Sequence, residues 1–414
     1  MHFLTPARAL APSLLMALTL ALPGLAGCAR DPVPQPLETA AGSGAMLPRL
    51  NSDAAGRVWL SWVEPASGGH ALRFSALEDE RWGPARTAAR GEHWFVNWAD
   101  FPSLLHLGDE RFAAHWLRKL EGGPYAYEVL MAVSSDGGEH WSSPVTPHGD
   151  GTATEHGFAS LFPVAGGVGA VWLDGRNTGG GGDGGGHDHG GGGAMTLRAG
   201  GLDWAGQPLP DAQLDAMTCD CCPTSAAASM QGTVVVYRGR SKNEIRDIFA
   251  TTLGPEGWSA PVAVATDDWE MPACPVNGPA IAARGKRVAA AWFTAPGGRP
   301  SVRVGFSLDG GRSWSEPAEV AAGATLGRVA IVMPDEDSAV VSWLESAEGG
   351  AVIRYRRMHA DGRSGRAMAL ASTSAARSSG FPQLALQGER LVFAWTEVGE
   401  PSAIATATVP MPRQ

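Results

Sequence analysis

The amino-acid sequence predicts an all-β protein, and within that class a β-propeller, from three observations. A unit of one apolar strand, a polar turn and a second strand that ends near Trp recurs along the chain. The 55 glycines and 30 prolines are typical of many short strands joined by tight turns. Hydrophobic residues make up 44% of the 414 residues, which is ample for one large core.

The recurring unit predicts the number of blades. Its copies begin at Leu47, Phe101, His156, Cys221, Asn277, Leu326 and Gly380, so that successive starts lie between 49 and 65 residues apart. A second pair of short strands follows each copy, and a four-stranded antiparallel unit repeated at this period is a propeller blade. We therefore expect seven blades, with six as the alternative. The last copy has three evident strands, so a strand near residues 37–40 is expected to complete it and close the ring.

Two turns share one sequence pattern. Ser134–Trp141 and Ser307–Trp314 both read S-x-D-x-G-x-x-W. In such a turn the Asp accepts backbone N–H groups, the Gly permits a positive φ, and the Trp packs between strands. The pattern resembles the Asp-box, or BNR repeat, of sialidase-like propellers. The resemblance supports the fold prediction, and the six-bladed alternative corresponds to the catalytic sialidases.

The N-terminus has the pattern of a targeting segment. Arg8 precedes an apolar run over residues 9–25, which ends in the string Leu25-Ala26-Gly27-Cys28. This string resembles the bacterial lipobox, which implies a signal peptide over residues 1–28, lipidation of Cys28 and a membrane anchor; an ordinary cleaved signal is the alternative. Ala29 after the Cys resembles the sorting signal for the outer membrane. We expect a linker over residues 29–43 and the propeller over residues 44–414, in the cell envelope and facing the periplasm or the cell surface.

The charge balance bears on the partners. Lys and Arg number 32 against 42 Asp and Glu, a formal net charge of -10. Phosphate neutralisation needs basic clusters, and none stands out, so nucleic acid is not expected as a partner.

One face of the propeller is predicted to carry the chemistry. In a four-stranded blade, the loop before the first strand and the loop after the second open on the same face. The loops predicted there are rich in His, Cys, Asp and Arg, and functional residues commonly lie on loops held by a rigid scaffold. These loops are Glu92–Asp100, Pro147–Phe158, Asp174–Asn177, Met217–Thr224, Tyr237–Asp247 and Asp267–Gly278.

The arginines of this face suggest an acidic ligand. Arginine forks bind carboxylates bidentately, and sialidases hold the sugar carboxylate with three arginines. The resemblance implies binding or hydrolysis of acidic glycans, with Tyr237 as nucleophile helped by Glu244, and with Asp100, Asp150 and Glu155 as acids. Pro48-Arg49-Leu50 resembles part of the family's arginine motif. The alternative is that the arginines pair with nearby carboxylates. The residues predicted to bind the ligand are Arg176, Arg238, Arg240, Arg246, Arg328, Trp269 and Asn277.

Cysteine and histidine form a second constellation in the same loops. Four cysteines in an oxidising compartment most often form two disulfides. The alternative is a thiolate site for a divalent metal or copper, joined by His148 or His156. The cysteines are Cys219, Cys221, Cys222 and Cys274. A metal site in these loops would make the chain a metal-linked envelope protein, as an alternative to the glycan function. A further alternative is a non-catalytic scaffold that binds an envelope protein.

A glycine-rich insertion spans residues 179–193. His187, Asp188 and His189 at its centre either bind a divalent metal or are solvated decoration of a flexible loop.

Overall fold

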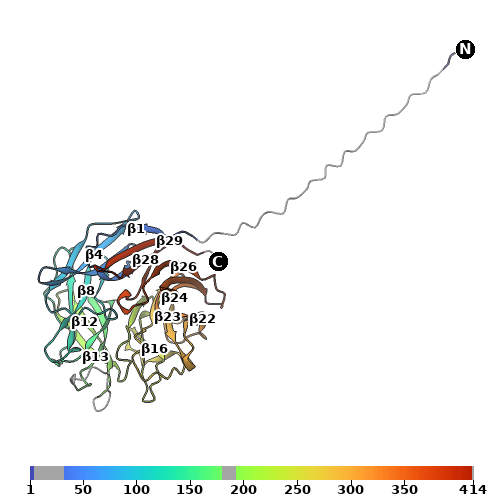
Figure 1. The fold of residues 1–414 in the computed structure, drawn as a ribbon. Coiled ribbons are helices and arrows are strands. Elements are labelled where there is room, and N and C mark those ends of the chain that lie inside the picture. The colour runs from blue at the N-terminus through green and yellow to red at the C-terminus, as the bar shows by residue number, and fades with distance from the viewer. Residues whose placement is uncertain (4–31, 180–192, 413–414) are drawn as a thin grey trace. The chain divides into compact units, whose positions relative to one another are not determined.

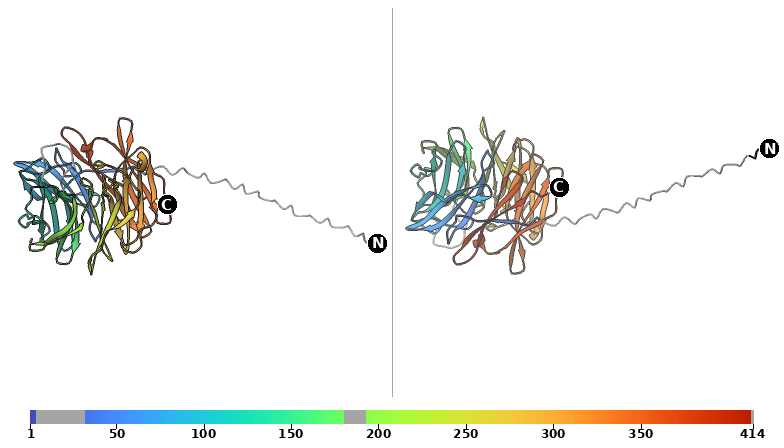
Figure 2. Two further views of the ribbon diagram at one scale, coloured as in Figure 1. Left: turned by 90° about the horizontal axis from the view of Figure 1, so that it is seen from below. Right: turned by 90° about the horizontal axis from the view of Figure 1, so that it is seen from above.

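A computed structural model describes residues 1–3, 32–179 and 193–412. The chain divides into two units, Met1–Pro32 and Val33–Gln414, and the second unit is the propeller. Figure 1 shows its blades in chain order around a ring, and Figure 2 shows the same ring from below and from above. The predicted lipidation site Cys28 and the triplet His187, Asp188 and His189 lie outside the described residues.

Seven antiparallel sheets form the seven predicted blades. Blades one and four divide the outermost strand into two pieces, and blade two keeps only an isolated bridge between Met131 and Val145 at that position. The first three blades comprise β2 (Met46–Ser52), β3 (Val58–Ala66), β4 (Gly69–Glu78), β5 (Arg81–Trp82) and β6 (Arg86–Gly91); β7 (Ser103–His106), β8 (Phe112–Lys119) and β9 (Tyr127–Ser134); and β10 (His156–Val164), β11 (Gly167–Asp174), β12 (Thr196–Asp203) and β13 (Pro208–Asp215).

The remaining blades follow in the same order, with two short 3-10 helices, η1 (Pro296–Gly298) and η2 (Arg377–Ser379), in their loops. Their strands are β14 (Ser225–Ser229), β15 (Gly232–Arg238), β16 (Ile248–Gly254), β17 (Gly257–Trp258) and β18 (Val262–Ala265); β19 (Ala280–Arg284), β20 (Arg287–Thr294), β21 (Ser301–Ser307) and β22 (Ala318–Ala322); β23 (Thr325–Asp335), β24 (Ser338–Ala347), β25 (Gly350–His359) and β26 (Met368–Thr373); and β27 (Gln383–Gln387), β28 (Arg390–Glu397), β29 (Ala403–Pro410) and β1 (Gln35–Leu37).

The ring closes through the two ends of the propeller unit. Strand β1 pairs antiparallel with β29, with Gln35 opposite Thr408 and Leu37 opposite Thr406. The predicted closing strand is confirmed, although it spans residues 35–37 and not 37–40. Pairing at this position covers the free edge of β29, which would otherwise be open to another chain.

The hydrophobic core is divided among the blade interfaces. Seven buried clusters occur in the described residues, and six of them lie between two neighbouring blades. The seventh lies between blades three and four and also includes Ala99 and Phe381 from the loops before blades two and seven. Trp62, Trp172, Trp292 and Trp343 are almost fully buried, each on the second strand of its blade. The Trp near the end of the repeating unit is therefore a packing residue, and Tyr237 takes its place on β15.

The two S-x-D-x-G-x-x-W turns follow β9 and β21, the third strands of their blades. Asp136 Oδ1 accepts the N–H of His140 at 3.0 Å, and Asp309 Oδ1 accepts the N–H of Ser313 at 2.9 Å. A Cβ at Gly311 would lie 2.7 Å from Val234 of the preceding blade, so this close approach requires glycine. These turns lie at the opposite end of the blades from the loops that carry the candidate site.

Among the described residues, no helix has the length and apolar character needed to cross a membrane.

Candidate functional site

The predicted loops meet at one end of the propeller. Since strands alternate in direction, the loop before the first strand and the loop after the second reach the same end of every blade. Contacts join these loops across blades: Asp100 Oδ1 accepts the N–H of Phe158, and Thr224 Oγ1 donates to the Phe158 carbonyl at 2.7 Å. The polar residues of this face form three groups, which we call the thiol cluster, the histidine cluster and the axial channel.

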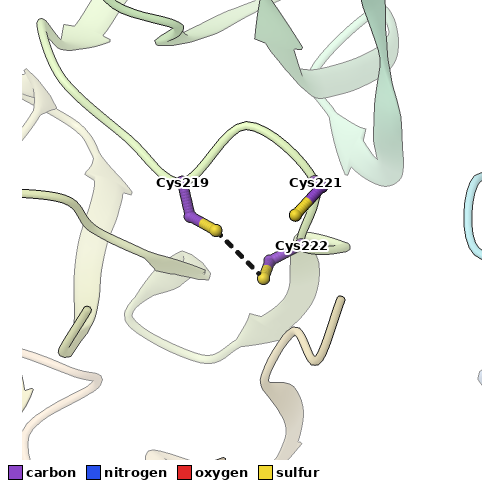
Figure 3. Close-up of side chains that lie close together, drawn as sticks. All are labelled: Cys219, Cys221 and Cys222. Carbon is purple, nitrogen blue, oxygen red and sulfur yellow. Dashed lines mark hydrogen bonds between the residues drawn. The ribbon is translucent and has the colours of Figure 1, made fainter. Parts of the chain in front are cut away.

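The thiol cluster consists of Cys219, Cys221, Cys222 and Cys274. The first three are buried, and their Sγ atoms all lie within 4.8 Å of one another. Cys219 and Cys222 are the closest pair, with 3.2 Å between the sulfur atoms (Figure 3). Cys274, from the loop between blades four and five, hydrogen-bonds Cys221. All four are free thiols in this structure, whereas a disulfide joins its sulfur atoms at about 2.05 Å.

Backbone contacts hold the thiol cluster in place. The N–H of Cys219 donates to the Arg238 carbonyl at 3.0 Å, which ties the cysteine loop to the end of β15. The second cysteine loop is pressed against the first, because a Cβ at Gly278 would lie 2.0 Å from the Pro223 carbonyl oxygen. Only glycine allows this approach, so the sequence fixes how the two loops meet.

Two buried arginines flank the thiol cluster. Arg238 donates to the backbone carbonyls of Asn277, Arg246 and Phe293, and its guanidinium lies 5.0 Å from the centre of the Trp269 ring. Arg246 donates to Glu244 at 2.6 Å, while its buried Nη1 has no hydrogen-bond partner. Two cations in a buried site favour an anionic partner beside them.

The thiols differ in their affinity for protons. Burial raises the pKa of Cys219 to about 12. Burial also opposes ionisation of Cys222, but hydrogen bonds with Cys219 and Cys221 and the charge of Arg238 together hold its pKa well below the usual range. These surroundings favour the ionised form of Cys222 over that of Cys219, and the Cys219 thiol donates to the Cys222 sulfur.

The histidine cluster lies on blade three and the loop before it. The rings of His148 and His156 stack with centroids 3.9 Å apart and an interplanar angle of 6°. Asp150 Oδ1 lies 3.1 Å from His148 Nδ1 and 3.3 Å from His156 Nε2. Arg176 binds Asp174 through Nε and Nη2 at 2.7 Å each, and Nη2 also contacts Asp211 at 3.0 Å.

Asp100 and Glu155 meet at a tyrosine that the sequence did not single out. The Tyr127 hydroxyl oxygen lies 2.8 Å from Asp100 Oδ2 and 2.9 Å from Glu155 Oε1. Burial raises the pKa of Asp100 to about 7, against the lowering effect of its hydrogen bonds with Tyr127 and Phe158. Tyr127 itself is almost fully buried and stacks on Phe95, so this trio joins blades two and three inside the protein.

The other predicted catalytic residues lie in separate networks. The Tyr237 hydroxyl donates to Asp215 Oδ2 at 2.5 Å, and burial together with the Asp215 charge raises its pKa far above the usual value. Glu244 accepts from Arg240 and Arg246 at 2.6 Å each. The tyrosine, glutamate and aspartates predicted from the sialidase resemblance are thus not brought together as one set.

The remaining predicted ligand residues bind their own scaffold. Arg328 donates to the Ser379 hydroxyl at 2.8 Å and to the carbonyls of Ala376 and Gly380 at 3.1 Å. Asn277 Oδ1 accepts the N–H of Arg328 at 2.7 Å. Trp269 is buried beneath Arg238. The predicted pairing of arginines with carboxylates holds for Arg176, Arg240 and Arg246.

One arginine faces the axial channel. Arg49 on β2 lines a cavity of about 150 Å³ bounded by first strands of several blades. Its guanidinium lies 4.7 Å from the centre of the Phe101 ring, its Nε has no hydrogen-bond partner, and within the described residues no carboxylate pairs with it. Burial lowers the Arg49 pKa to about 10. The signal in the sequence was the short string Pro48-Arg49-Leu50.

The comparisons with known proteins show a similarity of fold and nothing more specific. No protein family matches the sequence, and no curated protein matches it either. Among solved structures, the chain is similar to the NanB sialidase of Streptococcus pneumoniae (10% identity, TM-score 0.44, 88% of this chain and 68% of that one). It is also similar to the α-L-arabinofuranosidase Arb93A of Fusarium graminearum (11% identity, TM-score 0.47, 89% of this chain and 93% of that one). A third similar structure is the endosialidase of phage phi92 (7% identity, TM-score 0.48, 93% of this chain and 70% of that one). At identities this low, the similarity to these structures carries no argument. The strand order of this chain establishes that it is a propeller.

Proposed function

We propose that this protein binds a soft metal ion, Cu(I) above all, through the thiol cluster on its loop face. The observation that carries the proposal is the convergence of three buried sulfur atoms within 4.8 Å of one another, with Cys274 beside them. Thiolate sulfur is the ligand type that selects Cu(I), whereas carboxylates and carbonyls suit harder ions.

The surroundings of the cluster support a metal–thiolate unit. Cu(I) carries one positive charge, so two or three thiolates around it leave a net negative charge. Arg238 and Arg246 are buried cations next to these sulfur atoms and would offset that charge. Bonds to sulfur of about 2.3 Å would put neighbouring ligand atoms roughly 3.8 Å apart, which is within the spread of this cluster.

Loss of one central thiol tests the proposal. We expect wild-type protein to take up one Cu(I) per chain in competition with a chromogenic Cu(I) chelator, and Cys222→Ser to weaken this binding at least about 100-fold. Met217→Leu removes a sulfur atom from the same loop outside the cluster and should leave binding unchanged. Thiol counting and elemental analysis of protein taken from its native compartment complete the test: four oxidised cysteines and no metal would refute the proposal.

The proposal includes a location in the cell envelope, with a lipid anchor at Cys28. We expect metabolic labelling with a fatty acid to mark the wild-type chain and not Cys28→Ser. Labelled lipid on both chains, or on neither, would contradict the anchor.

Arg49 supports a second candidate function, the binding of an acidic glycan at the axial channel. A guanidinium that no carboxylate of the described residues neutralises is suited to a ligand carboxylate, and Phe101 beneath it offers an aromatic surface. In this alternative, sialosides or uronic-acid glycans bind, and Arg49→Met weakens their binding about 10- to 100-fold through loss of one charged hydrogen bond. Arg363→Met, at an exposed position, is the control. Glycan-array binding that is absent, or equal in both variants, would reject this function.

A further inference from the structure

We infer that the axial channel binds a small anion, such as chloride or formate, through Arg49 and Ser225. Arg49 lies on β2 of blade one and Ser225 on β14 of blade four, so they reach the channel from different sides of the ring. Both line the cavity of about 150 Å³ and a smaller one of about 50 Å³. The site shares no residue with the thiol cluster. It uses the guanidinium of the glycan candidate, and the experiment below distinguishes the two ligands.

The charge of Arg49 is the first argument. Its Nε is buried and donates to no acceptor, and within the described residues no carboxylate pairs with its guanidinium. Charged groups inside folded proteins are usually paired, because an uncompensated buried charge is strongly destabilising. The Phe101 ring, 4.7 Å from the guanidinium, offsets part of this cost, but only an anion neutralises the charge.

The groups around Arg49 supply no negative charge. His115 is fully buried, and burial together with the Arg49 charge lowers the pKa of His115 to about 3, so its ring is neutral at physiological pH. The other polar side chains that line the two cavities are all uncharged. They are Asn51, Ser103, Ser160, Thr224, Ser225 and Gln383. A single positive charge among neutral walls favours one monovalent anion.

Ser225 supplies a hydrogen-bond donor from the other side of the ring. Its Oγ accepts the N–H of Ile281 at 3.3 Å, and within the described residues no acceptor takes its hydroxyl hydrogen. Because Ser225 lines both cavities, this hydrogen is available to a ligand in them. Hydrogen bonds with an ionised partner are about twice as strong as neutral ones, so an anion gains more here than a neutral ligand.

The size of the cavity limits the ligand to a small anion. Pockets for drug-sized ligands measure about 300–1,000 Å³, whereas this cavity measures about 150 Å³. Chloride, or a one-carbon acid such as formate, is small enough to fit. A complete sugar acid is too large to reach the guanidinium without displacing the walls.

The channel offers an entrance at the end opposite the loop face. On the loop-face side the cavity is bounded by Phe101 and Phe381, whose ring centroids are 5.7 Å apart. Toward the other end, the first strands continue into a second pocket of about 550 Å³. It is lined by residues that directly follow those of the cavity, among them Ser52, Ala282 and Val332. We therefore expect the anion to enter through this second pocket.

Titrations of the intact chain with chloride test the site, with gluconate as the replacing anion so that ionic strength is constant. The midpoint of thermal unfolding should rise with chloride and then saturate, because a ligand that binds only the folded state stabilises it. Wild-type protein should also broaden the ³⁵Cl NMR line, and formate should reverse this broadening by competition.

Two variants connect these effects to the site. Ser225→Ala should weaken chloride binding about 10-fold, through loss of one hydrogen bond to a charged group. Ser372→Ala removes a hydroxyl at an exposed position and should bind chloride as wild type does. Arg49→Met should abolish both the saturable rise of the unfolding midpoint and the broadening.

The inference is overturned if wild type shows no saturable response to chloride or formate, or if Arg49→Met responds as wild type does. It is also overturned if sialic acid binds through Arg49 while chloride and formate do not, a result that would support the glycan candidate. Cu(I) uptake by the thiol cluster is measured separately, so its outcome does not affect this test.

Discussion

Replacement of Arg238 by methionine should destabilise the folded protein by at least about 3 kcal/mol. The Arg238 side chain is almost fully buried, and it donates to the carbonyls of Asn277, Arg246 and Phe293 at 2.6–3.0 Å. Methionine has similar length but donates no hydrogen bond. Each buried acceptor left without a donor costs about 1–3 kcal/mol, and three carbonyls lose theirs together.

Urea denaturation measures this effect. The midpoint should fall for Arg238→Met with an unchanged dependence on urea concentration, which marks a change in stability and not in the denatured state. Arg363→Met is the matched control, because Arg363 is exposed and its guanidinium pairs with the nearby, exposed Asp361. An exposed ion pair of this kind contributes about 0–1 kcal/mol. A loss under about 1 kcal/mol for Arg238→Met would show that other donors or water replace the guanidinium.

The arginines also show how far the repeat pattern reaches as a predictor. The spacing of the repeats correctly brought Arg238, Arg246 and Arg328 to the loop face, since position in the repeat determines the end of the blade. The spacing could not indicate the direction in which each arginine side chain points. Arg238 and Arg328 turn toward backbone carbonyls, and these acceptors belong to no sequence pattern. Most of these carbonyls belong to a neighbouring blade, and a repeat pattern does not indicate which carbonyls of that blade an arginine will reach.

The fold itself could be predicted further than the site because it depends on local patterns that repeat. Buried strands, turn glycines and a Trp on the second strand recur with each blade, and even the closing strand was expected within a few residues of β1. The trio of Asp100, Tyr127 and Glu155 has no such repetition. Tyr127 stands at the start of an apolar strand, and only the contact between blades two and three gives it two carboxylates.

The cysteine site could be predicted in part from the sequence. Their sequence predicted proximity, because Cys219, Cys221 and Cys222 are nearly consecutive and Cys274 lies in the next loop of the same face. The sequence alone leaves their chemistry open between disulfides and a metal site, and the metal site remains a prediction. What the structure adds is the pair of buried arginines, which come from β15 and the loop after it.

The stability of the protein should depend on pH through Asp100. The Tyr127 hydroxyl has one hydrogen but lies within 2.9 Å of two carboxyl groups, so both contacts are satisfied when Asp100 is protonated and donates to the tyrosine oxygen. The folded pKa is about 7, raised by burial above the ordinary value of 3.8. The folded state therefore binds this proton more tightly than the unfolded state. The stabilisation is fully present below pH 4 and is lost as pH rises through 7.

Asp100→Asn isolates this contribution. The amide has the shape of the protonated acid and does not titrate, so the free energy of unfolding of wild type relative to Asp100→Asn should fall by up to about 4 kcal/mol between pH 4 and pH 8. Glu121→Gln, at an exposed position, controls for the loss of one carboxylate. Thermal or urea unfolding across this range gives the difference. A wild-type curve parallel to that of Asp100→Asn would mean that Asp100 is ionised in the folded protein, and that Tyr127 donates to it while Glu155 finds another donor.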